Sequence, residues 1–554
     1  MRSVLSLAVG LLAAVASAAP SQVVEERQTA SRYVFAHFMM GIVGNRQSAD
    51  AYDEEFRTAK AAGIDAFALN MGPDVSNTQL GYAYDSAARV GIKVFISFDF
   101  NSGLFSINDP GAVGARIKAF KDKPAQLIID RKPFVSTFAG PGLNVAAVEA
   151  AAGSEIYFLP NWYPGNDQTG TDGFFNWMGW YSDGNNNPGT TPPSAGDAAW
   201  INWVGSKERY MAPVAPWFST HYGDWVPYRK NWVFQSNDLW FTRWNEILKL
   251  GPRFIEIVTW NDFGESAYVG PLKGQHYDDG HSKWVNDMPH GGWLEMAKPY
   301  IAAYKAGATA PTITEEKLVY WYRPTPKGIT CSGDNLGKPS GWDLMTDEVF
   351  VVALLKTAGT VVATSGSNTR EFSAPAGASL HKLPLGVGMQ KFTLKRGTTQ
   401  VFSDISLRDI VNTCPCGIYN FNAYVGTVPA AAPDVLVDNS AIASSVPAGY
   451  VCEPKPSLPI RAPGSQATVV PAVSSKPPTS PTPTSKAAAT TSTTKAQTPV
   501  APPPTTTKAA AEGCTKTVSV SSQIFPTNCL GSGQVWIGGG DSPDCCDGAK
   551  PCCG

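Results

Sequence analysis

Short apolar segments alternate with amphipathic segments from about residue 33 to residue 304. The amphipathic segments have a helical period, as at Ala51–Ala62, Gln79–Val90 and Leu239–Leu250. Strands that alternate with helices indicate βαβ units and a parallel sheet. The apolar segments are rich in Val, Ile, Phe and Tyr, which is typical of strands buried on both faces. Seven segments are of this kind: Tyr33–Met40, Asp65–Asn70, Lys93–Asp99, Pro133–Ala139, Ile156–Trp162, Tyr210–Trp217 and Phe254–Asp262.

The number of predicted strands favours an α/β fold of the (β/α)8 barrel type over residues 30–308, with one strand missed or irregular. The alternative is a doubly wound open sheet. That fold usually carries a glycine-rich phosphate turn, and no G-x-G-x-x-G follows the first strand. Several predicted strands also end in polar or aromatic residues, at the edge where barrels bind their substrates. These strand ends are His37, Asn70, Asp99, Asn161-Trp162, Trp217 and Trp260-Asn261-Asp262.

The pattern changes after about residue 315, where strand-like segments follow one another without helices. This pattern predicts an antiparallel β-sandwich within residues 309–452. Its expected strands are Leu318–Tyr322, Glu348–Leu355, Thr360–Ala363, Phe392–Lys395, Val401–Ser406 and Gly417–Tyr424. Four cysteines fall in this region, at 331, 414, 416 and 452. We expect two disulfides here, and their pairing stays open because sequence does not determine it.

The two ends of the chain differ from the rest. Residues 1–19 combine an early arginine, a short apolar run and small residues near Ala18, which is typical of a secretory signal peptide. Residues 453–512 are rich in Pro, Ser, Thr and Ala, which predicts an extended linker. Residues 513–554 carry six cysteines and are expected to form a small disulfide-stabilised module, a candidate for carbohydrate binding. We therefore expect a secreted, extracellular or cell-wall-associated protein.

The amino-acid composition excludes several classes of function. Aromatic residues make up 11% of the 554 residues and charged residues only 16%, and the formal net charge is −2. A nucleic-acid-binding protein needs an excess of basic residues, which this chain lacks. Beyond the N-terminus no apolar run reaches the 18 residues of a membrane span. Nothing in the sequence indicates an obligate oligomer, so we expect a monomer.

The segment Trp260–Ser266 is the most informative for chemistry, because Asp262 and Glu265 follow a predicted buried strand and are flanked by aromatic residues. Apolar surroundings raise the pKa of one carboxyl group, which then holds a proton, while the other stays ionised and activates water. Two such groups are what glycoside hydrolysis requires. The alternative is that Asp262 caps a following helix with support from Glu265. The abundance of Trp and Tyr favours the sugar interpretation, because their flat faces pack against sugar rings.

Other polar residues are weaker candidates. Asp99 is expected to tune the carboxyl pair or bind a sugar hydroxyl, and Asp65, at a strand start, is expected at the stable opposite end of the barrel. His37 and His221 are candidates at the mouth. One loop holds His276, His281 and His290 with Asp278 and Asp279, yet no H-E-x-x-H or other fixed ligand spacing occurs, so we expect no metal and no cofactor. No G-x-S-x-G elbow is present, which disfavours an esterase.

Several motifs together resemble the fungal α-1,3-glucanases, or mutanases, of glycoside hydrolase family 71. The resemblance covers about residues 31 to 427. It rests on Ala36–Phe38, Gly63–Gly72, Phe95–Asp99, Val135–Gly140, Ala215–Phe218, Thr259–Ser266 and Tyr320–Pro324. It implies an enzyme that cuts α-1,3-glucosidic bonds with inversion and without a metal, and it implies that Asp262 and Glu265 carry catalysis. No resemblance extends to the cysteine-rich end.

We therefore predict a secreted endo-acting α-1,3-glucanase. Glu265 is favoured as the general acid and Asp262 as the general base, with the opposite order left open. The expected sugar-contacting residues lie at the strand ends and in the loops after them: His37, Asn70, Asp99, Trp217, His221, Trp260, Asn261 and Tyr268. Two alternatives remain, a glycosidase of the same fold that acts on another glucan and a non-catalytic protein that binds wall polysaccharide.

Overall fold

The computed structural model describes residues 31–72, 76–432, 434, 517–520 and 523–526. The predicted signal peptide (1–19) and linker (453–512) lie outside these residues. Within the cysteine-rich segment, the described part is an antiparallel pair of strands, β18 (Thr517–Val520) and β19 (Gln523–Pro526). In the part of the chain that the structure describes, no helix has the length and apolar character needed to cross a membrane.

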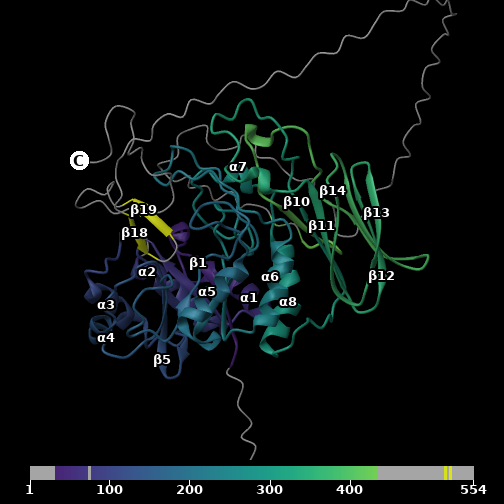
Figure 1. The fold of residues 1–554 in the computed structure, drawn as a ribbon. Helices are drawn as coiled ribbons and strands as arrows, with labels where there is room; N and C mark the ends of the chain where they lie inside the picture. Colours follow the sequence, from purple (N-terminus) through teal and green to yellow (C-terminus); the bar gives the residue numbers. More distant parts are fainter. Residues whose placement is uncertain (1–30, 73–75, 433, 435–516, 521–522, 527–554) are drawn as a thin grey trace, which may run out of the picture. The chain divides into compact units, whose positions relative to one another are not determined.

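A curled parallel sheet forms the first part of the chain (Figure 1). From β1 to β6 each parallel strand pairs with the next parallel strand. β7 pairs with β8, β8 with β9, and β9 returns to pair with β1, so the sheet bends round on itself. The ladder is open between β6 and β7, and a short antiparallel strand, β4 (Ile128–Ile129), adds to β5. The parallel strands are β1 (Tyr33–Met39), β2 (Ala66–Met71), β3 (Lys93–Asp99), β5 (Lys132–Phe138), β6 (Tyr157–Asn161), β7 (Phe174–Phe175), β8 (Tyr210–Val214) and β9 (Phe254–Ile257).

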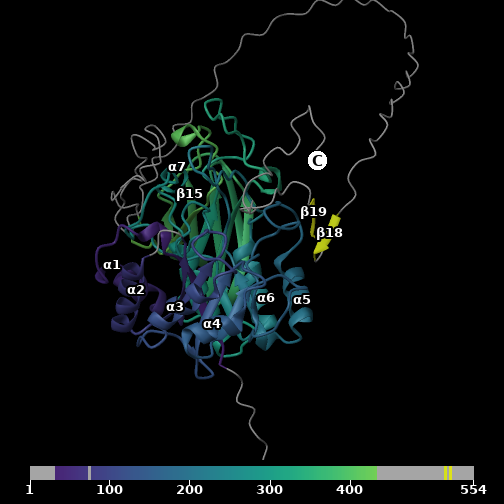
Figure 2. The ribbon, with the colours of Figure 1, turned by 90° about the vertical axis from the view of Figure 1, so that its left-hand side faces the viewer.

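Helices cover the outer face of this sheet (Figures 1 and 2). Local signals set their ends. For example, α2 starts after Ser76, whose hydroxyl accepts a hydrogen bond from Gln79 N at 3.2 Å, and stops at Gly91 with φ 77°. The helices are α1 (Asp50–Ala61), α2 (Asn77–Val90), α3 (Pro110–Phe120), α4 (Val145–Ala152), α5 (Pro193–Val204), α6 (Leu239–Leu250), α7 (Ser282–Val285) and α8 (Gly291–Lys305). Short 3-10 turns are η1 (Gly41–Val43), η2 (Lys207–Arg209), η3 (Trp342–Leu344) and η4 (Pro415–Gly417).

Each of the seven predicted parallel strands is present, with ends that shift by a few residues. The strand that sequence analysis missed is β7, which has only two residues and gives no periodic signal. The predicted strand Phe254–Asp262 was too long, because β9 ends at Ile257 and the chain then turns into a loop. The parallel α/β part of the fold prediction is confirmed.

The inner side of the curled sheet changes from apolar to polar along the strands. Four phenylalanines from different strands form a cluster near the strand starts, with ring centroids 4.6 to 6.0 Å apart. Side chains two positions apart in a strand share a face. His37 therefore follows Phe35 on the inner side of β1, and Glu256 follows Phe254 on β9. The alternation places charged groups inside the sheet toward its carboxyl edge. The cluster is formed by Phe35, Phe95, Phe134 and Phe254.

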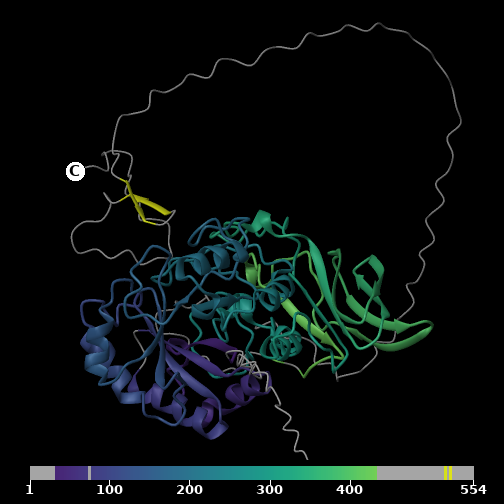
Figure 3. The same cartoon turned by 60° about the horizontal axis from the view of Figure 1, so that its bottom comes forward.

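Two antiparallel four-stranded sheets follow (Figure 3). One has the order β14-β11-β10-β17 and the other β13-β12-β15-β16. The prediction missed β13 and β14, and its last strand was wrong, because residues 417–423 form a turn and loop before β17. The strands are β10 (Lys317–Tyr322), β11 (Glu348–Leu355), β12 (Gly359–Ser365), β13 (Asn368–Ala374), β14 (Gly377–Pro384), β15 (Gln390–Arg396), β16 (Thr399–Ile405) and β17 (Tyr424–Val428).

Covalent and polar links hold this second part. Cys331 and Cys414 form a disulfide with Cα atoms 5.8 Å apart, and Cys416 is also disulfide-bonded. Indole nitrogens connect the antiparallel region to the parallel one: Trp217 Nε1 donates to Phe421 O at 2.9 Å. In the opposite direction, Trp321 Nε1 donates to Asn237 O at 2.7 Å.

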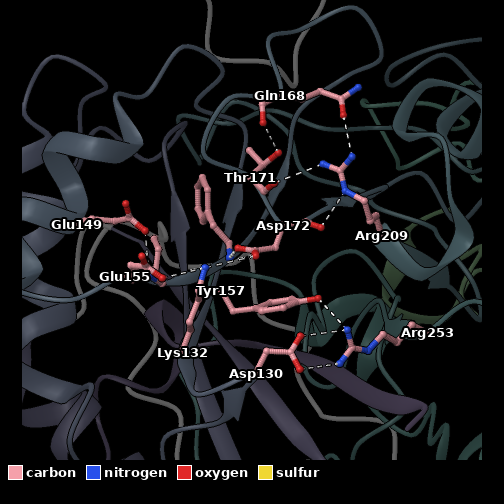
Figure 4. A network of polar contacts seen from close by, with 12 residues as sticks. Asp130, Lys132, Glu149, Glu155, Tyr157, Gln168, Thr171, Asp172, Arg209 and Arg253 are labelled. Carbon is pink, nitrogen blue, oxygen red and sulfur yellow. Dashed lines mark hydrogen bonds and ion pairs between the residues drawn. The ribbon is translucent and has the colours of Figure 1, made fainter. Parts of the chain in front are cut away.

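A network of polar contacts lies at the amino-terminal edge of the parallel sheet (Figure 4). Arg209, just before β8, donates to Asp172 O at 3.1 Å and to Gln168 Oε1 at 3.3 Å. Arg253, just before β9, donates to Tyr157 OH at 3.1 Å. At this same edge Asp65 pairs with Lys305 at 2.6 Å, in agreement with its expected place away from the mouth.

Candidate active site

The loop after β9 carries the two predicted catalytic carboxyl groups. Thr259 shapes the start of the loop: its Oγ1 accepts a hydrogen bond from Asp262 N at 2.8 Å, and its own N donates to Ala267 O at 2.6 Å. Asp262 Oδ1 in turn accepts from Glu265 N at 3.2 Å. The two carboxyl groups therefore project from one tight turn at the carboxyl edge of the sheet.

The alternative role for this pair was to cap a helix. Asp262 does make the hydrogen bond of an N-cap, since its Oδ1 accepts from the amide three residues on. Residues 263–266, however, form a turn, and the next helix is α7 at Ser282. Helix capping thus leaves the presence of two acidic side chains at this place unexplained.

Glu265 has a cationic partner. Its Oε1 forms an ion pair with Lys230 Nζ, and the side chains of Glu265 and Lys230 are 14% and 23% exposed. Lys230 reaches the site from the segment between β8 and α6. There its main chain forms a short antiparallel bridge with Tyr222, with hydrogen bonds of 2.6 and 3.0 Å. The backbone thus fixes the position from which the ammonium group reaches Glu265.

The two carboxyl groups differ in their electrostatic surroundings. Burial raises the pKa of Asp262, and the negative charge of Glu265 raises it further, while Lys230 opposes the shift; the result is a pKa of about 8. Asp262 therefore keeps its proton near neutral pH. Glu265 is the member of the pair that lies against an ammonium group.

A third carboxylate, Asp279, organises the side chains around the pair. It accepts hydrogen bonds from Tyr222 at 2.7 Å, Tyr228 at 2.5 Å and His281 at 2.7 Å. Burial alone would raise the pKa of Asp279, but the hydrogen bonds and charge of His281 and the two tyrosine hydroxyls outweigh it and lower the pKa to about 2. Asp279 is thus a fixed anion, and both of its carboxylate oxygens already accept hydrogen bonds from neighbouring side chains.

A second polar group lies inside the sheet at the same edge. His37 Nδ1 is 2.7 Å from Glu256 Oε1, and both side chains are fully buried. The rings of His37 and Trp177 meet nearly at right angles, with centroids 4.7 Å apart. Among the described residues, His37 Nε2 and Glu256 Oε2 have no hydrogen-bond partner. Buried polar atoms of this kind cost stability unless something else, such as water or a ligand, satisfies them.

Asp99, at the end of β3, belongs to this second group. Burial raises the pKa of Asp99, and the hydrogen bond from Asn101 N, the charge of His37 and a hydrogen bond with Asn70 only partly oppose the shift. The predicted residues His37, Asn70 and Asp99 therefore lie together at the ends of three adjacent strands, β1 to β3.

The main chain connects the two groups. Trp260 N donates to His37 O at 2.7 Å, so the loop that carries Asp262 continues along the end of β1. The Asn261 side chain strengthens this connection: its Oδ1 accepts from Met39 N at 2.7 Å and its Nδ2 donates to Met39 O at 3.3 Å. Asn261 has no exposed surface, and these hydrogen bonds fix the loop to β1.

The structure also gives packing roles to four other residues predicted to contact sugar. Trp217, Trp260 and Tyr268 are at most 1% exposed. Trp260 Nε1 donates to Glu55 at 3.1 Å, and Tyr268 stacks on His290 with centroids 3.8 Å apart. His221 is 4% exposed and is held by Asn231 and Asp334. The core takes up the aromatic faces of Trp217, Trp260 and Tyr268.

Asp278, Asp279 and His281 place three potential metal-binding atoms within 4.8 Å of one another. Protein donors already use most of these atoms. Asp278 Oδ1 accepts from Gly280 N at 2.8 Å and from Ser282 N at 3.3 Å, and Asp279 accepts three side-chain hydrogen bonds. The geometry is that of a hydrogen-bonded cluster that supports the Asp279 anion.

Comparison with known proteins identifies the family. The sequence model described as glycosyl hydrolase family 71 matches residues 30–438. The chain belongs to glycosyl hydrolase family 71. This family 71 chain is 42% identical over 410 residues to a mutanase of Penicillium rubens, an alignment that covers 72% of this chain and 89% of the relative.

Two relatives from Schizosaccharomyces pombe are also similar to this family 71 member. One is named glucan endo-1,3-alpha-glucosidase and is 39% identical, over 72% of this chain and 95% of the relative. The other is named ascus wall endo-1,3-alpha-glucanase and is 26% identical, over 71% of this chain and 96% of the relative. A solved structure of a GH99 endo-alpha-mannosidase from Bacteroides thetaiotaomicron aligns with a TM-score of 0.36 at 13% identity, over 50% of this chain and 98% of that one.

Several residues of the site in this family 71 chain escaped sequence analysis. Lys230, Tyr222 and Tyr228 lie in an irregular segment with no periodic pattern, so nothing in the sequence connects them with Glu265. The sequence marked Asp279 only as one of several possible metal ligands in the loop that holds His276, His281 and His290. Glu256 did leave a signal, since it is a lone charged residue inside the apolar run Phe254–Thr259. A buried charge in a strand interior requires a partner, and here the partner is His37.

Proposed function

We propose that this family 71 enzyme hydrolyses α-1,3-glucosidic bonds inside chains of α-1,3-glucan, the mutan of fungal cell walls. The names of the Penicillium and Schizosaccharomyces relatives support this substrate. The observation that carries the catalytic part of the proposal is the pair of carboxyl groups on one turn. Asp262 holds a proton and Glu265 faces a lysine, so one acid and one base stand ready at neutral pH.

In the proposed reaction Asp262 is the general acid and Glu265 the general base. Asp262 protonates the glycosidic oxygen as the bond to the anomeric carbon breaks, and Glu265 takes a proton from the water that attacks from the opposite face. This order reverses the one favoured from sequence, and the raised pKa of Asp262 is the reason. Inversion at the anomeric carbon requires roughly 6.5–9.5 Å between the carboxyl groups, with the water between them.

Lys230 has a defined part in this division of roles. Its ammonium group forms the ion pair with Glu265 and at the same time lowers the pKa of Asp262. The proposed acid is therefore kept from becoming too weak to release its proton to the substrate.

The group formed by His37, Asn70 and Asp99 is proposed to bind the hydroxyl groups of a glucose unit. The partnerless Nε2 of His37 and the half-buried carboxyl group of Asp99 supply hydrogen-bonding atoms of the type that sugars need. Glu256 Oε1 lies 2.7 Å from His37 Nδ1 and fixes the orientation of the His37 ring.

We infer a (β/α)8 barrel for residues 30–308 and an accessory β-sandwich for residues 309–452. The protein is proposed to be secreted as a monomer, consistent with the sequence pattern of residues 1–19. The cysteine-rich end is proposed as a module that anchors the enzyme to insoluble glucan.

The decisive experiment measures reducing sugar released by the purified protein from α-1,3-glucan, α-1,4-glucan and β-1,3-glucan. We expect release from α-1,3-glucan alone, and early NMR spectra that show the β-anomer as the first product, as inversion demands. Glu265→Gln keeps the shape of the side chain and removes the base. We expect it to lower kcat by about a thousandfold or more while the thermal transition stays within a few degrees.

The outcomes separate the alternatives. Release from another glucan only would mean that a different polysaccharide is the substrate. Binding of glucan without release of sugar would favour a non-catalytic wall-binding protein. Wild-type turnover by Glu265→Gln would reject the catalytic assignment itself.

A further inference from the structure

Exposed aromatic side chains are rare in the described part of this protein, despite its aromatic composition. Most Trp and Phe side chains there are buried or only partly exposed. Two tyrosines are the exceptions: Tyr163, 44% exposed, and Tyr228, 39% exposed. Of the two, Tyr228 lies in the segment between β8 and α6 that also carries Lys230.

Tyr228 is held rigidly although it is exposed. Its hydroxyl donates to Asp279 Oδ2 at 2.5 Å, and its ring meets the ring of Tyr222 nearly at right angles with centroids 5.3 Å apart. Asp279 is itself fixed by Tyr222 and His281. A ring that is held at both its hydroxyl and its edge loses little conformational entropy when a ligand packs against it.

Tyr228 also lies next to the carboxyl pair. Lys230 Nζ is 5.8 Å from the centre of its ring, and the same ammonium group is the ion partner of Glu265. Burial of the hydroxyl raises the pKa of Tyr228, and the nearby carboxylates of Asp279 and Glu265 add to the shift, which reflects the same proximity. The exposed ring is therefore adjacent to the place where bond cleavage is proposed.

The geometry points to Tyr228 as a platform on which a glucose ring of the polysaccharide stacks, next to the bond that is cut. A pyranose ring presents a flat face of C–H groups, which packs against an aromatic face while its hydroxyls remain hydrated. Asp279 acts as the positioning residue that holds the platform. This inference rests on the proposed function, since the ligand it names is the same α-1,3-glucan.

Three variants test the platform. Tyr228→Ala removes the ring, whereas Tyr228→Phe keeps the ring and loses only the hydrogen bond to Asp279. Tyr228→Leu keeps apolar bulk without a flat face. We expect a KM on α-1,3-glucan that rises about five- to tenfold in the Ala and Leu variants and less than threefold in the Phe variant. Because the residue binds and does not transfer protons, kcat should change less than KM in all three.

Binding is measured separately in the inactive Glu265→Gln background, by depletion of the protein from solution with insoluble α-1,3-glucan. The bound fraction should fall with Tyr228→Ala and stay near the parent value with Tyr228→Phe, and thermal transitions of all variants show whether they are folded. Equal losses in the Ala and Phe variants would overturn the inference, because the hydroxyl and not the ring would then matter. So would unchanged KM and binding in Tyr228→Ala. If the wild-type enzyme releases no sugar from α-1,3-glucan, it is the proposed function that fails.

Discussion

At the level of single residues, Lys230 decides how the proton is shared between the two carboxyl groups. Asp262 must be protonated to act as the acid, so activity should be present below its pKa of about 8 and decline as the pH rises through that value. Lys230 lowers the pKa of Asp262. In Lys230→Met we therefore expect the alkaline limb of the kcat/KM profile to move to higher pH by about one unit. We also expect kcat at its maximum to fall at least tenfold, since Glu265 loses its counter-ion.

Lys230→Arg is the matched control, because it keeps a positive charge at the same place. Its alkaline limb should stay close to the wild-type position even if the rate falls, since the guanidinium group is larger and differently shaped. A Lys230→Met enzyme with an unchanged pH profile would show that this charge does not influence Asp262 in solution.

At the level of elements, a disulfide connects the loop that follows β10 with the loop that precedes β17. Cys331 follows β10 and Cys414 precedes β17, and these strands pair in one sheet. The disulfide closes a loop in which the two residues are 83 positions apart, so its main effect is on the unfolded chain. Replacing both cysteines by alanine should lower the free energy of unfolding by about 4 kcal/mol.

Denaturant unfolding of the double variant measures this loss, with the other cysteines left in place so that only one disulfide is removed. Hydrolysis at low temperature should remain near the wild-type rate, because the disulfide does not contact the carboxyl pair. An unchanged unfolding midpoint would mean that the strand pairing alone holds β10 and β17 together.

Some strands could be predicted from the sequence and others could not. Buried parallel strands were predictable because their apolar runs are long and contrast with the helices between them. The two-residue strand β7 and the edge strands β13 and β14 were not, since short or half-exposed strands leave a weak pattern. The place of Asp262 and Glu265 in a loop just after a strand was predictable from the apolar run before them. The burial of Trp260 and Trp217 was not, because a tryptophan at a strand end can point either into the core or toward solvent, and sequence does not say which.

At the level of the whole molecule, the two edges of the parallel sheet have different tasks, and the last prediction tests this separation. The carboxyl edge carries the proposed chemistry, whereas the amino-terminal edge carries the network of Arg209, Asp172 and Gln168 (Figure 4). Arg209 connects residues that precede β7 with the start of β8. Arg209→Met keeps the aliphatic stem and removes these hydrogen bonds. We expect it to lower the free energy of unfolding by about 1–3 kcal/mol and to leave kcat and KM unchanged well below the thermal transition.

Lys132→Met is the control at the same edge. Its ammonium group forms ion pairs with Glu155 at 3.2 Å and with Asp172 at 3.8 Å. The Glu155 side chain is 73% exposed and the contact with Asp172 is long, so the loss should stay under about 1 kcal/mol. Both variants remove one cation from the same edge. A difference between their stability losses therefore reflects the surroundings of the lost contacts and not the loss of charge alone. Calorimetry gives the two stabilities, and the α-1,3-glucan assay gives the rates. A large fall in kcat for folded Arg209→Met would contradict the separation, since it would show that the amino-terminal edge controls the position of the carboxyl groups at the opposite one.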